Sequence, residues 1–178
     1  MNDSALQRIA YKAGITRISE SVYGFVREAG NMYLRSITEY AEIYAEYEGK
    51  KTISGDHAIH AIENTGFADQ YKIKDSLKPC KISGKVKVLA KIREYQKQHD
   101  CNTLAKAPIE RDIKSFTHFK ISKEGVQNIH SALEYFIYKL FFSALLITLN
   151  AKRKTVSVDD VKLTLRMIND NCKSINFR

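Results

Sequence analysis

The residues of this chain best suited to chemistry are short runs of basic and hydroxyl side chains, and they occur twice. Arg17-Ile18-Ser19 precedes Lys51-Thr52-Ile53-Ser54, and Lys120-Ile121-Ser122 precedes Lys154-Thr155-Val156-Ser157. The second pair follows the first at an interval of 103 residues without a gap. Basic side chains bind phosphate groups, which are the same whatever the base sequence of a nucleic acid. The repetition indicates that one unit has been duplicated and fused.

Helical patterns separate and follow these runs in each copy. Apolar residues between the runs recur at spacings of three and four, which mark one face of a 3.6-residue period. They are Val22, Phe25, Val26, Ala29, Tyr33, Ile37, Ala41 and Tyr44 in copy one, and Val126, Ile129, Leu133, Ile137, Leu140, Ala144 and Ile147 in copy two. Each unit is therefore predicted to run helix, basic turn, long helix, basic turn, helix.

Serines stand where the predicted helices begin. A serine hydroxyl at that place can accept a hydrogen bond from an unpaired first-turn amide, so Ser19, Ser54, Ser122 and Ser157 are predicted helix caps. Ser157 with Asp160 also fits the wider form of a capping box.

The order of elements resembles the histone fold, and the resemblance extends to individual segments. The first copy is similar to histone H4 at 5–10, 14–19, Tyr23 and 50–53; the second is similar to histone H3 at 108–113, 119–121 and 151–155 with Asp160. Residues 92–97 are similar to the additional N-terminal helix of histone H3. The chain thus resembles a viral-type histone doublet, an H4-like fold followed by an H3-like fold, as in giant-virus core histones.

The resemblance implies an all-α protein in which the two histone folds pair in a handshake, because the long helix of a single unit would stay exposed. We expect an H4-like domain at residues 1–67, a basic linker at 68–84 and an H3-like domain at 85–178. The additional helix of the H3-like domain is expected at about residues 85–100.

Charge is distributed unevenly along the chain. Residues 1–67 hold seven Lys/Arg against nine Asp/Glu, a net of −2, whereas the whole chain has a net charge of +9. Much of the excess lies between Lys72 and Lys97, where nine basic residues accompany only Asp75 and Glu94. This segment is a candidate for following DNA; the alternative is a solvated connector.

The resemblance also implies two DNA-contact sites. Arg17 and Lys120 occupy the positions from which histones insert a basic side chain into the minor groove. One site combines Lys120 with Lys50, Lys51 and Thr52, and the other combines Arg17 with Lys152, Lys154 and Thr155. Further DNA-binding residues are expected at Arg8, Lys12, Arg93, Lys97, Lys106, Arg111 and Arg153.

Arg153 is also expected to pair with Asp160 and so to tie the second turn to the last helix. The first copy departs from this arrangement, because Lys50 replaces the arginine and His57 stands at the acidic position. Asp56, one residue earlier, is a candidate substitute for the missing acid.

Two partner surfaces follow from the resemblance. The H3-like half is expected to associate with a second copy through Ile147, Asn150, Asp160, Leu163, Arg166 and Met167. In the H4-like half, Tyr44, Tyr47 and His60 stand where a histone of the H2-type docks, so the expected partner is a second doublet made from the two H2-type core histones, B followed by A. The alternative for this aromatic cluster is an ordinary helix face.

The sequence offers little support for catalysis or for a metal. His57 and His60 lie one helical turn apart without a recognisable third ligand, and Cys80, Cys101 and Cys172 have no metal-ligand spacing. The apolar run from Leu140 to Leu149 is shorter than the roughly 20 residues of a membrane span. We therefore expect no enzyme, no metal, no cofactor and no membrane association.

Two functions remain open at this point. The first is a core histone doublet that binds, bends and wraps double-stranded DNA without sequence specificity and packages a viral genome, located in the virion and in a host nucleus or viral factory. The alternative is a histone-fold interaction scaffold of a transcription or chromatin complex, which the acidic first half favours.

Overall fold

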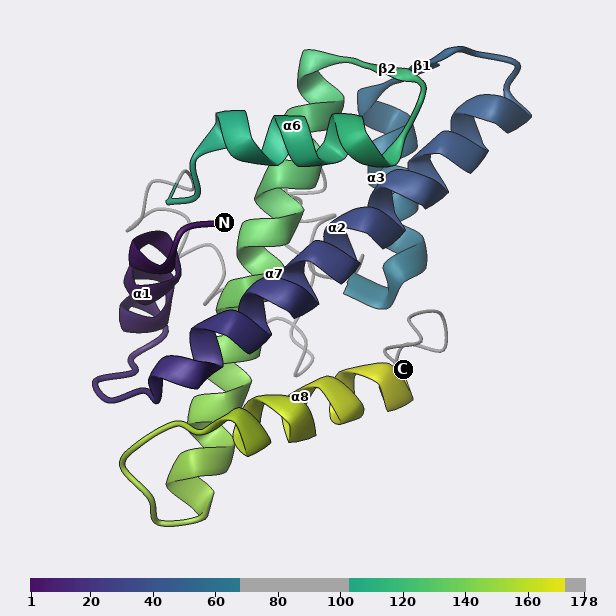
Figure 1. Ribbon diagram of the computed structural model, residues 1–178. Helices are drawn as coiled ribbons and strands as arrows, with labels where there is room; N and C mark the ends of the chain where they lie inside the picture. The colour runs from purple at the N-terminus through teal and green to yellow at the C-terminus, as the bar shows by residue number, and fades with distance from the viewer. Residues whose placement is uncertain (68–102, 172–178) are drawn as a thin grey trace, which may run out of the picture.

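The computed structural model describes residues 1–67 and 103–171, and its elements occur as two series (Figure 1). The first series is α1 (Asp3–Lys12), α2 (Glu20–Tyr47), β1 (Thr52–Ile53), α3 (Gly55–Ile62) and a π-helical turn (Glu63–Phe67). The second is α6 (Lys106–Phe116), β2 (Lys120–Ile121), α7 (Lys123–Asn150) and α8 (Val158–Asn171). The all-α prediction is confirmed. The linker at 68–84, the helix at about 85–100, and Arg93 and Lys97 lie outside the described residues.

The interval of 103 residues found in the sequence also relates the helices. The long helices α2 and α7 each contain 28 residues, and they begin at Glu20 and Lys123. The first helices begin at Asp3 and Lys106. Every feature of one half therefore has a counterpart 103 positions away in the other.

The two long helices cross each other in the middle of the molecule (Figure 1). Tyr33 of α2 and Phe136 of α7 stack there with ring centroids 4.2 Å apart and an interplanar angle of 11°. These residues are counterparts, so they lie on the approximate twofold axis that relates the halves. Offset stacking of two buried aromatic rings adds about 0.5–1.5 kcal/mol to the area that they bury.

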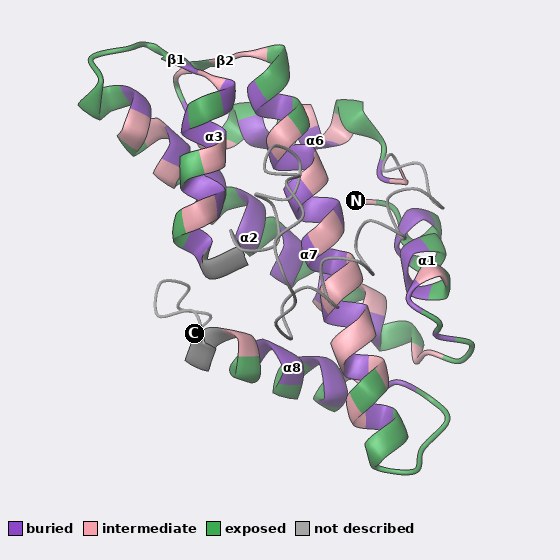
Figure 2. Cartoon of the chain, turned by 180° about the vertical axis from the view of Figure 1, so that it is seen from behind, coloured by how far each residue is buried: buried purple, intermediate pink, exposed green. Residues whose placement is uncertain are grey.

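The shorter helices pack across the halves. α3 contacts both long helices, α1 packs on α7, α6 on α2, and α8 on α7 and α2. One continuous apolar core results, and Leu6, Ile37, Ile113 and Leu133 are fully buried in it. Figure 2 shows the buried positions along the inner faces of the helices. Because each buried aliphatic side chain contributes roughly 1.5–3 kcal/mol, neither half retains its core without the other. The handshake is therefore what the structure shows.

Three of the four predicted capping serines make bonds at helix starts. Ser122 Oγ accepts from Gly125 N at 2.9 Å, and Ser54 Oγ accepts from His57 N at 3.3 Å. At Ser157 the acid of the capping box reaches back, since Ser157 N donates to Asp160 Oδ2 at 2.9 Å. The prediction for Ser19 was wrong: it stands at the N-cap of α2, but its hydroxyl lies 3.2 Å from Ser21 Oγ and makes no capping bond.

Both long helices end in a residue with left-handed backbone geometry. Gly49 follows α2 with φ of 68°, and its counterpart Lys152 follows α7 with φ of 55°. Glycine adopts this conformation without a steric cost, whereas a residue with a Cβ pays for it. The chain reverses direction at each position and enters a basic turn.

Helix α7 is long enough and apolar enough to cross a membrane by length and composition alone. Half of its most apolar window is buried within the protein, where it packs on α1, α2, α3 and α8. Its composition is that of a central core helix.

Candidate nucleic-acid interface

The first basic site joins the second turn of the first half to the first turn of the second half. Strands β1 and β2 pair in parallel, with Thr52 opposite Lys120 and Ile53 opposite Ile121. Lys120 N donates to Lys51 O at 3.2 Å, and Ser122 N donates to Ile53 O at 2.9 Å. Backbone hydrogen bonds therefore hold Lys51, Thr52 and Lys120 side by side.

The second basic site is built in the same way at the other end of the molecule. Ile18 pairs in parallel with Val156, and Ser19 N donates to Val156 O at 3.0 Å. Val156 N in turn donates to Arg17 O at 3.1 Å. This pairing brings Arg17 beside Thr155 and Lys154. The sequence-based prediction that each first turn lies beside the second turn of the other copy is confirmed.

Burial divides each pair of turns into an anchored side and an exposed side. Ile53 and Val156 have no exposed surface, because they point into the core. The predicted DNA-binding side chains on the turns are all exposed: Arg17, Lys50, Lys51, Thr52, Lys120, Lys152, Arg153, Lys154 and Thr155. The alternation that buries one residue of a strand turns its neighbours outward. Each site thus presents cations and hydroxyls on a rigid backbone.

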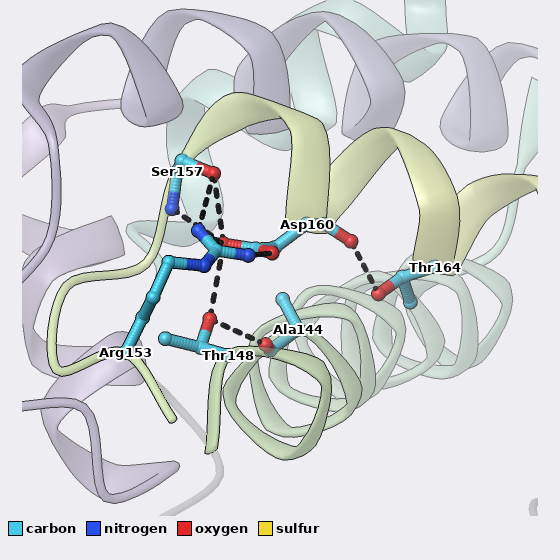
Figure 3. Close-up of polar contacts among 6 residues, drawn as sticks. All are labelled: Ala144, Thr148, Arg153, Ser157, Asp160 and Thr164. Atoms are coloured by element: carbon cyan, nitrogen blue, oxygen red, sulfur yellow. Dashed lines mark hydrogen bonds and ion pairs between the residues drawn. The ribbon is translucent and has the colours of Figure 1, made fainter. Parts of the chain in front are cut away.

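Asp160 ties the second turn of the second half to α8, as Figure 3 shows. Its Oδ2 accepts from Arg153 Nη1 at 3.0 Å, Thr148 Oγ1 at 3.0 Å and Ser157 Oγ at 2.8 Å, and Arg153 Nη2 pairs with Oδ1. Burial acts to raise the pKa of Asp160, but the hydrogen bonds from Arg153, Ser157 and Thr148 outweigh it and lower the pKa to about 2. The expected Arg153–Asp160 pair is confirmed, and it occupies much of the guanidinium that was also predicted to contact DNA.

The first half solves the same problem with other residues. Ser54 N donates to His57 Nδ1 at 3.2 Å, so the ring proton stands on Nε2, which lies 3.0 Å from Glu48 Oε2. Lys50 Nζ lies 2.6 Å from the same oxygen. Hydrogen bonds from Lys50 and then His57 lower the pKa of Glu48 to about 2. Asp56 does not supply the missing acid, because it is exposed in the first turn of α3 while Glu48, at the end of α2, faces the imidazole.

The remaining described candidates lie where α1 approaches the start of α6. Arg8, Lys106 and Arg111 are exposed, and Lys12 Nζ donates to Thr103 Oγ1 at 2.5 Å. A hollow of about 500 Å³ separates the two segments and is lined by Met1, Asn2, Ser4, Ala5, Arg8, Thr103, Leu104, Ala105, Pro108 and Ile109. These cations lie between the two paired-turn sites in the order of the chain and belong to a different part of the surface.

Comparison with known proteins matches each half separately. Residues 4–62 match the family of histone-like transcription factors (CBF/NF-Y) and archaeal histones. Residues 84–167 match the core histone domain of histones H2, H3 and H4. The chain contains histone-fold domains.

Relatives and solved structures agree with this assignment. Histone H4 of Encephalitozoon cuniculi (strain GB-M1) is 31% identical over 63 residues, which are 35% of this chain and 61% of the relative. The major histone H4 of Tetrahymena pyriformis is 27% identical over 62 residues, which are 35% of this chain and 60% of the relative. The chain therefore spans about three fifths of the length of these relatives. The crystal structure of the histone from Methanopyrus kandleri superposes with a TM-score of 0.63 at 17% identity and covers 92% of both chains, which shows a shared fold.

Histone-fold proteins bind DNA or form assemblies with other histone folds, and none of these matching families is an enzyme family. Within residues 1–67 and 103–171, no three His, Cys, Asp or Glu side chains gather as metal ligands would. The DNA-binding roles of individual residues stay predictions.

The self-association surface predicted for the second histone fold lies at the end of α7 and along α8. Leu163 and Met167 are 46% and 54% exposed, and Asn150 and Arg166 are exposed beside the half-buried Ile147. The structure adds Leu146 and Leu149, which are 47% and 55% exposed. Asp160 is not presented there, because its buried carboxylate faces Arg153. The spacing of Leu146 and Leu149 on a nearly uniformly apolar helix gave no signal for their exposure.

The docking surface predicted for the first histone fold lies at the end of α2 and on α3. Tyr47 is 90% exposed, and the Tyr44 and His60 rings lie 5.5 Å apart. Asn64 Nδ2 donates to Tyr44 Oη at 2.6 Å, which holds the phenol in place. Ile43, which the sequence did not single out, is 57% exposed beside them.

Proposed function

We propose that this protein is a core histone doublet that binds, bends and wraps double-stranded DNA without sequence specificity. The observation that carries the proposal is the pairing of the turns, Thr52 with Lys120 and Ile18 with Val156, which produces two exposed basic sites on one rigid body. Two separated phosphate-binding sites on a protein that does not deform favour a curved path of the duplex between them.

The two sites are unequal in their expected strength. Arg17 and Lys120 are the counterparts proposed to enter the minor groove. An ammonium group is more strongly hydrated than a guanidinium and is less suited to a narrow groove, so the Lys120 site is the weaker one. If the complex contacts six to ten phosphates, its affinity should fall roughly a thousandfold or more between low and moderate salt.

Packaging further requires association of several chains. The proposed assembly pairs two copies through the exposed apolar ends of α7 and α8, and then adds two doublets of the H2-type core histones at the Tyr44, Tyr47 and His60 surfaces. The resulting nucleosome-like particle would package a viral genome, in the virion and in a host nucleus or viral factory.

Nuclease digestion of reconstituted DNA tests the proposal. The protein alone should protect a discrete length of DNA, and addition of an H2-type doublet should lengthen it. A smear with and without the partner would reject packaging.

A second function is favoured by one observation. Residues 4–62 match a family that includes histone-like transcription factors, and residues 1–67 carry a net charge of −2. A scaffold of this kind would bind partner proteins and would not protect DNA. Replacing Arg17 and Lys120 together by alanine separates the functions, because only a DNA-packaging protein should lose affinity for every DNA sequence alike.

A further inference from the structure

The same face of the two long helices carries opposite chemistry in the two halves. On α2 this face presents Glu39, Glu42, Ile43, Glu46 and Tyr47, which recur at spacings of three and four. Their counterparts on α7 are Phe142, Leu145, Leu146, Leu149 and Asn150. Three glutamates thus stand where the other half has phenylalanine and two leucines. We call the α2 residues the acidic face.

The acidic face has an apolar centre that is open to solvent. Ile43 is 57% exposed and Tyr47 is 90% exposed, although both are large side chains that gain from burial. Glu39 is paired with Arg35 along the same helix at 2.8 Å. In the described part of the chain, no ion pair involves Glu42 or Glu46. An exposed aromatic residue framed by carboxylates is typical of the rim and anchor of a docking site.

Charge decides between the possible occupants of this face. A second copy would meet it in an isologous arrangement, which places the same residues opposite each other. Glutamates would then face glutamates, and juxtaposed like charges oppose association. The α7 counterpart carries no charge among its five residues and accepts its own copy without that cost. The two ends of the molecule are therefore suited to different partners.

We propose that the acidic face docks a helical partner surface that carries lysine or arginine side chains around an apolar pocket for Tyr47. The inference rests on the proposed function, because it takes the partner to be another histone-fold protein, and it adds the chemistry that selects that partner. Glu42 and Glu46 supply the charge complementarity, and Ile43 and Tyr47 supply the buried area. An end that rejects its own copy also prevents open filaments, so assembly closes after two copies have met through α7 and α8.

Titration in the absence of DNA tests the docking directly. The probe is a fluorescently labelled dimer of the two H2-type core histones, and binding is measured at two ionic strengths. The wild type should bind, and Glu42→Lys with Glu46→Lys should weaken binding by at least about tenfold. Glu42→Gln with Glu46→Gln should weaken it less and should reduce its dependence on salt. The control is Glu20→Lys with Glu28→Lys, which makes the same charge change at exposed positions of the same helix.

Three results would overturn the inference. They are no binding of the wild type, equal binding by the wild type and the Glu42→Lys, Glu46→Lys variant, and an equal loss in the control. Sedimentation adds a fourth test: a variant with Leu146→Asp and Met167→Asp should be monomeric, and a dimer of it that Tyr47→Asp abolishes would make a second copy the occupant. Docking is measured without DNA, whereas the proposed function is measured by nuclease protection, so either can fail while the other holds.

Discussion

The carboxylate of Asp160 should contribute a stability that can be measured against pH. Its pKa of about 2 lies below the ordinary aspartate value of about 3.9. The difference corresponds to about 2.5 kcal/mol of folding free energy, since only the charged form accepts all the bonds from Arg153, Ser157 and Thr148. Because the pKa is lowered in the folded state, this stability is present above about pH 4 and is lost as the pH falls through about 2.

The perturbation is Asp160→Asn, which keeps the shape of the side chain and removes its charge. Urea unfolding between pH 6 and pH 2 should show a free energy of unfolding lower than that of the wild type by about 2.5 kcal/mol at neutral pH, and the difference should shrink toward zero at the acidic end. Carbon NMR of the Asp160 carboxyl should show its titration near pH 2.

Two control variants isolate the buried network. Asp159→Asn removes the same charge from the exposed neighbouring residue and should change stability little. Glu48→Gln removes the corresponding carboxylate of the first half, which water screens, and should have a much smaller effect than Asp160→Asn. A difference between wild type and Asp160→Asn that does not change with pH, or a carboxyl that titrates near 3.9, would refute the reasoning.

Three further predictions concern the turns. Ser122→Ala should lower the free energy of unfolding by about 1 kcal/mol, whereas Ser19→Ala should change it little because its hydroxyl makes no capping bond; equal losses in urea unfolding would contradict this. Lys152→Gly should raise stability by about 0.5–1 kcal/mol by relieving the left-handed backbone, while weakening DNA binding; an unchanged or lower midpoint would argue against strain there. Arg17→Ala with Lys120→Ala should reduce the slope of log affinity against log salt concentration by about 2 in fluorescence titrations, compared with Arg35→Ala and Lys114→Ala as the charge-matched control, and an unchanged slope would count against phosphate contact.

Much of the fold could be predicted because a duplication writes the same pattern twice. The interval between Arg17 and Lys120 placed both long helices, and the resemblance to histones supplied the handshake that pairs Ile18 with Val156. Periodicity alone would not have paired them, because it marks the face of a helix and not the neighbour that covers it.

The local details that escaped the sequence depend on distances that only the folded backbone fixes. Glu48 serves His57 because the left-handed Gly49 turns the chain back and brings the end of α2 over the start of α3. Asp56 is closer in sequence but points to solvent. The exposure of Leu146 and Leu149 could not be predicted either, since α7 is apolar over most of its circumference and gives a weak contrast between inside and outside.

The stacked pair Tyr33 and Phe136 has a consequence for how such a protein can change. In a dimer of two identical chains, a residue on the twofold axis faces its own copy, so each substitution alters both partners at once. Here the two rings belong to one chain, and each can be replaced independently while the other stays. The covalent connection also makes the pairing of the halves intramolecular, so their association does not depend on protein concentration. Fusion thus allows the centre of the handshake to become asymmetric while the equal proportion of the two halves is guaranteed.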